Sequence, residues 1–282
     1  MISLGHHCHD LDCLEEVIVG NGLSRGEFYN LPAEDIPSLK KRIEHHSLDW
    51  SIHAPLVRLD WYPQPPTWSF LCDVDADNRA LTMKMIDLTA SHAQEHGAEY
   101  IVVHFPSPAS DESGESDEKL ESIARRSCDR LAELSVKKSV PIHFEGVGQS
   151  RLINAEFLTA VLKEFTPLRY CFDTAHGNLA AIYNDFDLYE FLSAVLPYVG
   201  SMHLWNTRGR EDYLAFRHVP VHPSQSPEDG WVDIARVLQA VDTGGDSLPV
   251  IFENQPSYPE SLGGYDYREG VKWVKGLLGT SS

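Results

Sequence analysis

Six residues of types that bind metals stand at or beside the ends of short apolar runs in this 282-residue sequence. Two examples are Ile-His-Phe-Glu at positions 142–145 and Cys-Phe-Asp at 171–173. Strands that are buried on both faces of a parallel sheet consist mainly of apolar residues, and an unpaired buried carboxylate costs several kcal/mol. A shared cation would explain all six departures, which are His53, His104, Glu145, Asp173, His203 and Glu253.

A frame of parallel strands would position these residues, and the sequence contains eight apolar runs that alternate with segments of helical period. The expected strands are Met1–Leu4, Leu23–Tyr29, Leu48–His53, Glu99–Phe105, Val140–Glu145, Leu168–Asp173, Val199–Leu204 and Leu248–Glu253. Ser116 and Asn154 are expected helix N-caps, and Gly20 and Gly97 are expected C-terminal residues. No change of composition marks a linker, so the sequence predicts an α/β fold, a single (β/α)8 TIM barrel over residues 1–282. Longer loops at 56–77, 107–116 and 206–230 follow strands and are expected on the catalytic face.

Charge and cysteine content restrict the classes of function. The chain has 23 Lys and Arg against 42 Asp and Glu, a net charge of −19, which disfavours nonspecific binding to nucleic acid or an anionic membrane. The five cysteines form no CxxC pair, so a thiolate zinc site or a disulfide framework is not predicted. We find no long apolar segment and no secretory leader, and we expect a cytoplasmic protein.

Three motifs resemble the xylose isomerase-like TIM-barrel superfamily, which contains sugar and sugar-phosphate isomerases and epimerases together with endonuclease IV. They are Phe172-Asp173-Thr174-Ala175-His176, Met202-His203-Leu204-Trp205-Asn206 and Phe252-Glu253-Asn254, in the order and on the strands that the superfamily has. By resemblance to the ketose epimerases, Glu145, Asp173, His203 and Glu253 would hold one divalent ion. Three carboxylates and one imidazole suit Mn²⁺, Mg²⁺ or Co²⁺ and tolerate Zn²⁺.

The endonuclease branch implies further ligands, because those enzymes hold three zinc ions. His53, His104, His176 and His218 resemble its additional histidines. That branch has an Asp two residues before the last of these histidines, where this chain has Phe216. A complete third metal site is therefore not expected, whereas a second ion at His53 and His104 is compatible with the sequence.

Other polar residues have two interpretations each. His6, His7, Cys8 and His9 could form a local metal site after the first strand, but we expect a polar loop, with His7 near the pocket. Glu27 could reach the pocket or pair with Arg25. Arg208, Arg217 and Trp205 could bind the substrate, the arginines through hydroxyl or phosphate oxygens and the indole by packing on a sugar ring; surface ion pairs and loop packing are the alternatives.

The resemblance and the ligand types together predict a metal-dependent isomerase or epimerase that acts on a small sugar, a sugar phosphate or a polyol-derived ketone. Glu145 and Glu253 would be its acid and base, and His176 would orient a substrate hydroxyl. The alternatives are a multi-zinc phosphodiester hydrolase similar to endonuclease IV and a barrel that binds a ligand without catalysis. The acidic charge makes nucleic acid an unlikely partner, and the sequence does not predict an oligomeric state.

Overall fold

The computed structural model describes residues 1–106, 110–147, 150–242, 247–254 and 264–279. Eight parallel strands pair in chain order and close into one barrel between β1 and β8, as predicted. The strands are β1 Ile2–Cys8, β2 Arg25–Phe28, β3 Asp49–His53, β4 Ile101–Phe105, β5 Ile142–Gly146, β6 Leu168–Asp173, β7 Val199–Leu204 and β8 Leu248–Phe252.

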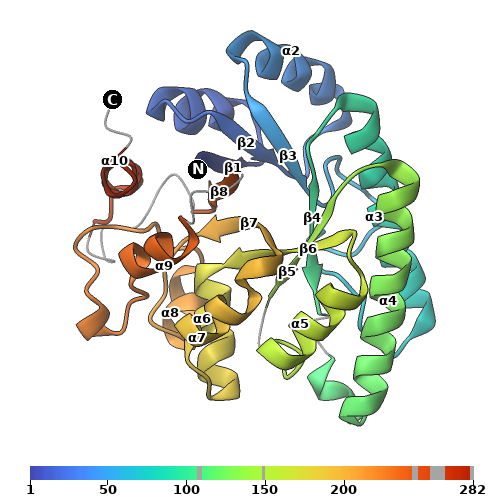
Figure 1. Ribbon diagram of the computed structural model, residues 1–282. Coiled ribbons are helices and arrows are strands. Elements are labelled where there is room, and N and C mark those ends of the chain that lie inside the picture. Colours follow the sequence, from blue (N-terminus) through green and yellow to red (C-terminus); the bar gives the residue numbers. More distant parts are fainter. Residues whose placement is uncertain (107–109, 148–149, 243–246, 255–263, 280–282) are drawn as a thin grey trace.

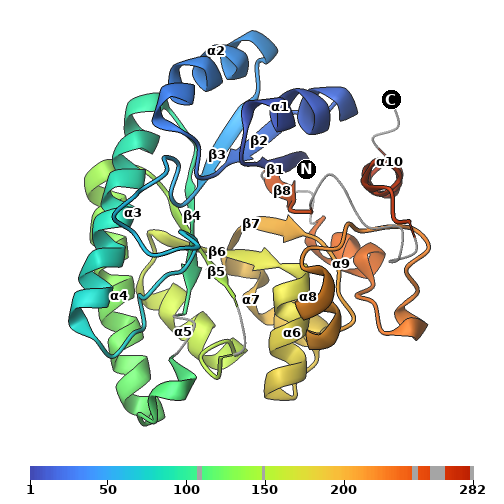
Figure 2. The same ribbon diagram turned by 180° about the vertical axis from the view of Figure 1, so that it is seen from behind.

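Helices surround the barrel, and Figures 1 and 2 show an outer ring that runs from α2 through α3, α4 and α5 to α9 and α10. Their bounds are α1 Leu11–Cys13, α2 Ile36–His46, α3 Ala76–His96, α4 Asp117–Lys138, α5 Ala155–Glu164, α6 Thr174–Asn184, α7 Leu188–Val195, α8 Arg210–Phe216, α9 Ile234–Val241 and α10 Tyr267–Leu277. Within the described ranges, none of them combines the length and the apolar content needed to cross a bilayer.

Phenylalanines at the strand ends explain how the core and the polar centre share the same strands. Side chains alternate between the two faces of a strand, so a buried phenylalanine toward the helices leaves its neighbour pointing into the barrel. The pairs are Phe28 after Glu27, Phe105 after His104, Phe144 before Glu145, Phe172 before Asp173 and Phe252 before Glu253, and all five phenylalanines belong to the main hydrophobic core. The apolar packing therefore fixes which side chains line the inside.

Helix caps follow the sequence with one exception. Ser116 and Asn154 accept hydrogen bonds from the amides of Lys119 (3.4 Å) and Phe157 (2.9 Å). Gly97 ends α3 in the left-handed conformation, with φ of 78°. The expectation for Gly20 is wrong, because the helical segment after α1 continues as a π turn and a 3₁₀ turn to Gly22, which has φ of 57°.

The structure departs from the predicted elements at three places. Strand β1 extends to Cys8, so the expected polar loop at His6 and His7 is wrong. Helix α6 was not predicted. It follows β6 without a loop, because Asp173, the last residue of β6, is also the N-cap of α6. The predicted loop at 206–230 contains the short helix α8. The loop expected at 107–116 lies partly outside the described residues.

Candidate metal centre

Four side chains from consecutive strands converge at the carboxyl end of the barrel. Glu145, Asp173, His203 and Glu253 each offer one ligand atom, and these atoms lie within 4.8 Å of one another. His203 Nδ1 lies 3.2 Å from Glu145 Oε1, 3.3 Å from Glu253 Oε2 and 4.0 Å from Asp173 Oδ2. All four residues are at most 8% exposed. Apart from its contact with His203, Glu253 Oε2 has no hydrogen-bond partner among the described residues, so it can also bind another group.

Asp173 is fixed by two contacts that leave its carboxylate facing the centre. Oδ1 accepts a hydrogen bond from the His176 amide at 2.6 Å and caps helix α6. Oδ2 accepts one from the indole nitrogen of Trp205, also at 2.6 Å. Because a helix N-terminus favours negative charge, these two contacts favour the ionised form that a metal requires, in opposition to burial and the neighbouring carboxylates.

Glu145 is shared between two groups of ligands. Its Oε1 faces His203, whereas its Oε2 lies 3.3 Å from the Nε2 atoms of both His53 and His104. His53, His104 and Glu145 form a second set whose ligand atoms also lie within 4.8 Å of one another. The pairing of strands β4 and β5 accounts for part of this geometry, since His104 and Glu145 are register partners.

Electrostatics in the ion-free centre show that negative charge is concentrated there. Burial and the carboxylates of Glu145 and Glu253 raise the pKa of Asp173 well above its usual range. Burial opposes the ionisation of Glu145, but the nearby imidazoles of His203 and His104 outweigh it and hold the pKa of Glu145 well below the usual value. A divalent cation would offset the burial and the repulsion that raise the pKa of Asp173, so the donor set fits a hard divalent ion.

His176 and His218 lie beside the centre in an aromatic group. The rings of His176 and His218 are 6.2 Å apart, and both lie against Trp205, at 5.2 and 4.4 Å. Burial lowers the pKa of His176 to about 4. Among the described residues, His176 and His218 belong to no group of three converging ligand atoms.

The predicted substrate-binding residues have other contacts. Trp205 is fully buried, so the expectation that its ring packs on a sugar is wrong; its indole positions Asp173 instead. Arg208 pairs with Asp212 at 2.6 Å and stacks on Trp231, which holds the guanidinium along α8. Arg217 lies over the ring of Tyr213 at 5.3 Å.

For Glu27 the sequence left two interpretations open, and for His7 it predicted a place near the pocket. Glu27 lies 2.8 Å from His203 and pairs with it, not with Arg25, whose partners are Glu99 at 2.9 Å and Asp49 at 3.6 Å. His7 packs against the ring of His53 at 5.5 Å. The sequence contains a signal for the position of Glu27. Arg25 and Glu27 are two residues apart on one strand, so their side chains lie on the same face, which here is the inside of the barrel.

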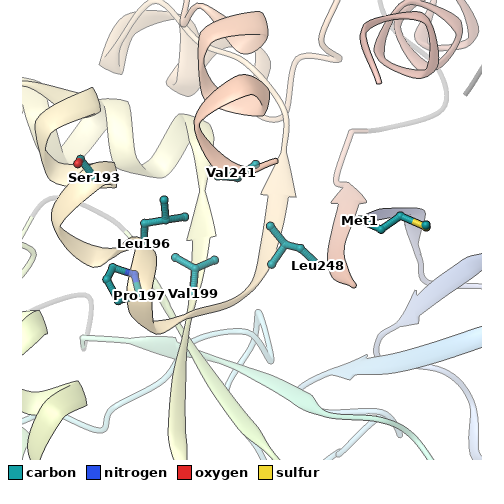
Figure 3. A pocket seen from close by; sticks show the side chains of 7 residues that line it. All are labelled: Met1, Ser193, Leu196, Pro197, Val199, Val241 and Leu248. Atoms are coloured by element: carbon teal, nitrogen blue, oxygen red, sulfur yellow. The ribbon is translucent and has the colours of Figure 1, made fainter. Parts of the chain in front are cut away.

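A cavity of about 430 Å³ lies at the opposite end of the barrel, where strands β7 and β8 begin (Figure 3). Its lining is mainly apolar and contains none of the strand-end residues described above; it consists of Met1, Ser193, Leu196, Pro197, Val199, Val241 and Leu248. In TIM barrels the amino ends of the strands serve stability and the carboxyl ends carry the chemistry, so the candidate site is the polar centre and not this cavity.

Comparison with known proteins gives the same fold. The family model described as xylose isomerase-like TIM barrel matches residues 9–277. The crystal structure of a D-tagatose 3-epimerase-like protein superposes with a TM-score of 0.73 at 17% identity, covering 99% of this chain and 98% of the other. The IOLI protein with a bound zinc atom gives a TM-score of 0.71 at 14% identity, covering 98% and 96%. An AP endonuclease, family 2, from Brucella melitensis gives 0.66 at 13% identity, covering 98% and 99%. No curated protein matches the sequence closely enough to be called a relative.

Proposed function

This chain belongs to the xylose isomerase-like TIM-barrel family, and from that premise we propose that it is a metal-dependent isomerase or epimerase of a small sugar, a sugar phosphate or a polyol-derived ketone. One observation carries the proposal. The carboxylates of Glu145 and Glu253 approach the same nitrogen of His203, at 3.2 and 3.3 Å, in a buried centre at the strand ends. Two carboxylates that face one position can exchange a proton with a carbon bound between them.

Each residue of the centre has a distinct task in this proposal. Glu145, Asp173, His203 and Glu253 hold a divalent ion, which supplies Lewis acidity to the carbonyl and hydroxyl oxygens of the substrate. Glu253 Oε2, which among the described residues contacts His203 and has no further hydrogen-bond partner, removes the proton from the carbon beside the carbonyl. Glu145, itself a carboxylate, takes the proton of the adjacent substrate hydroxyl and delivers it to the opposite face of that carbon, which inverts the carbon, and Glu253 returns its proton to the hydroxyl oxygen. Delivery to the neighbouring carbon would move the carbonyl instead. His176 Nδ1 is buried and also lacks a partner, and we assign it to a substrate hydroxyl.

Burial of the centre supports proton transfer at neutral pH. Burial opposes the ionisation of Glu253, but the imidazoles of His203 and His218 outweigh it and lower the pKa of Glu253. Glu253 is therefore a carboxylate when the substrate arrives. Exclusion of water from a site that is at most 8% exposed strengthens each electrostatic contact with the developing negative charge of the enediolate.

A phosphodiester hydrolase is the second candidate, and the shared position of Glu145 favours it. One oxygen of Glu145 faces each set of ligands, so Glu145 would be a ligand in both sets, and two ions held there would supply the activated water that phosphodiester hydrolysis needs. Charge favours the sugar reaction. The net charge is −19, and Asp111, Glu112 and Glu115 lie between β4 and α4 on the same end of the barrel, where they would repel a polyanion.

Hydrogen exchange tests the proposal. We expect the metal-loaded protein to incorporate solvent deuterium beside the carbonyl of at least one member of a panel of ketoses and sugar phosphates. Glu145→Gln and Glu253→Gln should reduce this exchange by about 10²–10⁴-fold at matched metal content. Glu112→Gln, on the surface between β4 and α4, is the matched control and should exchange normally. A wild-type protein that exchanges no carbon-bound hydrogen and cleaves DNA at abasic sites would establish the hydrolase instead.

A further inference from the structure

Glu27 is a buried carboxylate with no task in the proposed reaction. It lies on β2, which pairs with β3, and its side chain is 0% exposed. Its Oε1 lies 2.8 Å from His203 Nε2, and its Oε2 accepts a hydrogen bond from Ser51 Oγ at 3.0 Å. Glu27 and Ser51 are register partners, so the sheet itself brings the hydroxyl to the carboxylate.

His203 stands between this carboxylate and the proposed metal centre. Its Nδ1 faces Glu145 and Glu253, whereas its Nε2 faces Glu27 on the far side of the ring. An imidazole binds a metal through an unprotonated nitrogen, and the hydrogen bond made by the other nitrogen decides which tautomer is present. A carboxylate at Nε2 therefore selects the tautomer that leaves Nδ1 free.

We infer that Glu27, oriented by Ser51, is a positioning residue that keeps the proton of His203 on Nε2 and thereby presents Nδ1 to the divalent ion. This inference rests on the metal centre of the proposed function. It adds to that function a fifth side chain on which the affinity for the ion depends, although that side chain does not touch the ion.

Two other tasks for Glu27 agree less well with the contacts. As a direct ligand it would need an oxygen near the carboxylates, but the imidazole lies between, and among the described residues Glu27 belongs to no set of converging ligand atoms. As a structural ion pair it would need a permanent cation. The neighbouring Arg25 pairs with Glu99 and Asp49 instead, and within the described ranges the ion-pair partner of Glu27 is His203. Burying an unpaired carboxylate costs free energy, so we assign the position of Glu27 to its contact with His203.

Three substitutions test separately the negative charge of Glu27, its hydrogen-bond acceptor oxygen and its orientation by Ser51. Glu27→Gln keeps an acceptor oxygen and removes the charge, whereas Glu27→Met removes both. Ser51→Ala leaves the carboxylate but removes the hydroxyl that orients it. Ser201→Ala is the matched control, because Ser201 is an equally buried serine on β7 that bonds His143 at 2.9 Å.

The test is titration of the ion-free protein with Mn²⁺, followed by ¹⁵N NMR of the histidines in the Zn²⁺-loaded form. We expect Glu27→Gln to weaken Mn²⁺ binding about 10-fold and Glu27→Met about 100-fold, the range found for such outer partners of metal ligands. Ser51→Ala should weaken it less, and Ser201→Ala should not. The nitrogen shifts of His203 should show a protonated Nε2 in the wild type and a loss of that tautomer in Glu27→Met.

The outcomes distinguish this inference from the proposed function. Wild-type protein that binds no Mn²⁺ would overturn the metal centre and the inference with it. Wild-type binding with unchanged affinity in Glu27→Gln and Ser51→Ala would overturn the role of Glu27 and leave the centre in place. If Glu27→Met does not fold, the other two variants still decide. Equal weakening in Ser201→Ala would show a general effect of barrel packing and would also overturn the inference.

Discussion

Metal binding should release protons, because burial and neighbouring charges raise the pKa values of two of the proposed ligands in the ion-free centre. Burial and the facing carboxylates raise the pKa of Asp173 well above its usual range. Burial disfavours the charged form of His203, but the acidic groups around it, including Cys171 and Glu145, outweigh burial and raise the pKa of His203 well above 6.5. A cation must displace both protons, since only the carboxylate and the neutral imidazole bind metals.

The number of displaced protons sets the pH dependence. Each proton changes the apparent affinity tenfold per pH unit, about 1.4 kcal/mol. Two protons give about 100-fold per unit while the pH is below both raised pKa values. The sign is fixed, because binding competes with protons: affinity falls as the solution becomes more acidic. It rises with pH and levels off as the pH passes each of the two values in turn.

Calorimetry with Zn²⁺ or Mn²⁺ in buffers of different ionisation enthalpy counts the protons directly. Asp173→Asn has no acidic proton to lose, so it should bind more weakly, release one proton fewer and show a slope of only tenfold per unit. Asp187→Asn is the matched control, since Asp187 also caps a helix, α7, away from the centre. An affinity that is independent of pH, or binding without proton release, would refute the electrostatic account of the centre.

Three further predictions concern residues around the centre. Burial lowers the pKa of His6 to about 4, so as the pH falls from 6.5 to 4 the unfolded chain binds a proton that the folded chain does not, and stability is lost. His6→Asn should flatten the fall in unfolding free energy by about 1.4 kcal/mol per pH unit in that window, whereas exposed His9→Asn should not. His218→Ala should leave the number of tightly held ions unchanged in elemental analysis; loss of one ion would reveal a third site. Trp205→Phe, which removes the hydrogen bond to Asp173, should lower the unfolding free energy by about 1–3 kcal/mol in urea.

The barrel could be predicted because its strands and helices have different periods. The apolar runs predicted at 168–173 and 199–204 coincide with β6 and β7. In each run the polar residue near the carboxyl end is a candidate ligand. The predicted first strand ended too early, at Leu4, because the polar residues His6 and His7 are typical of a loop. In the structure His6 is buried neutral toward Tyr267, and His7 lines the polar interior, so polar residues occur on both faces of a genuine strand.

The convergence of the candidate ligands could also be expected, because parallel strands of a closed barrel bring their carboxyl ends together. Side-chain direction could not be read so easily. Trp205 follows His203 by two residues but lies just beyond β7, where the strand period no longer applies, and its indole turns to Asp173. Glu27 could not be assigned either, because a carboxylate beside Arg25 has the sequence of an ordinary ion pair. Only the barrel shows that His203 lies between Glu27 and the centre.

The protonation of His53, whose Nε2 lies beside Glu145 Oε2, bears on which of the two candidate reactions the centre suits. Burial disfavours the charged form of His53, but contact with Glu145 outweighs it and raises the pKa of His53. While His53 keeps its proton, it is a cation 3.3 Å from Glu145, and a second ion would have to displace that proton. The proposed centre would then hold one ion, and His53 could donate to a substrate oxygen, which suits a sugar. Once His53 loses that proton, His53, His104 and Glu145 become a ligand set for a second ion, which suits a phosphodiester. The metal content as a function of pH therefore bears on the reaction class, and one ion per chain at neutral pH would favour the isomerase.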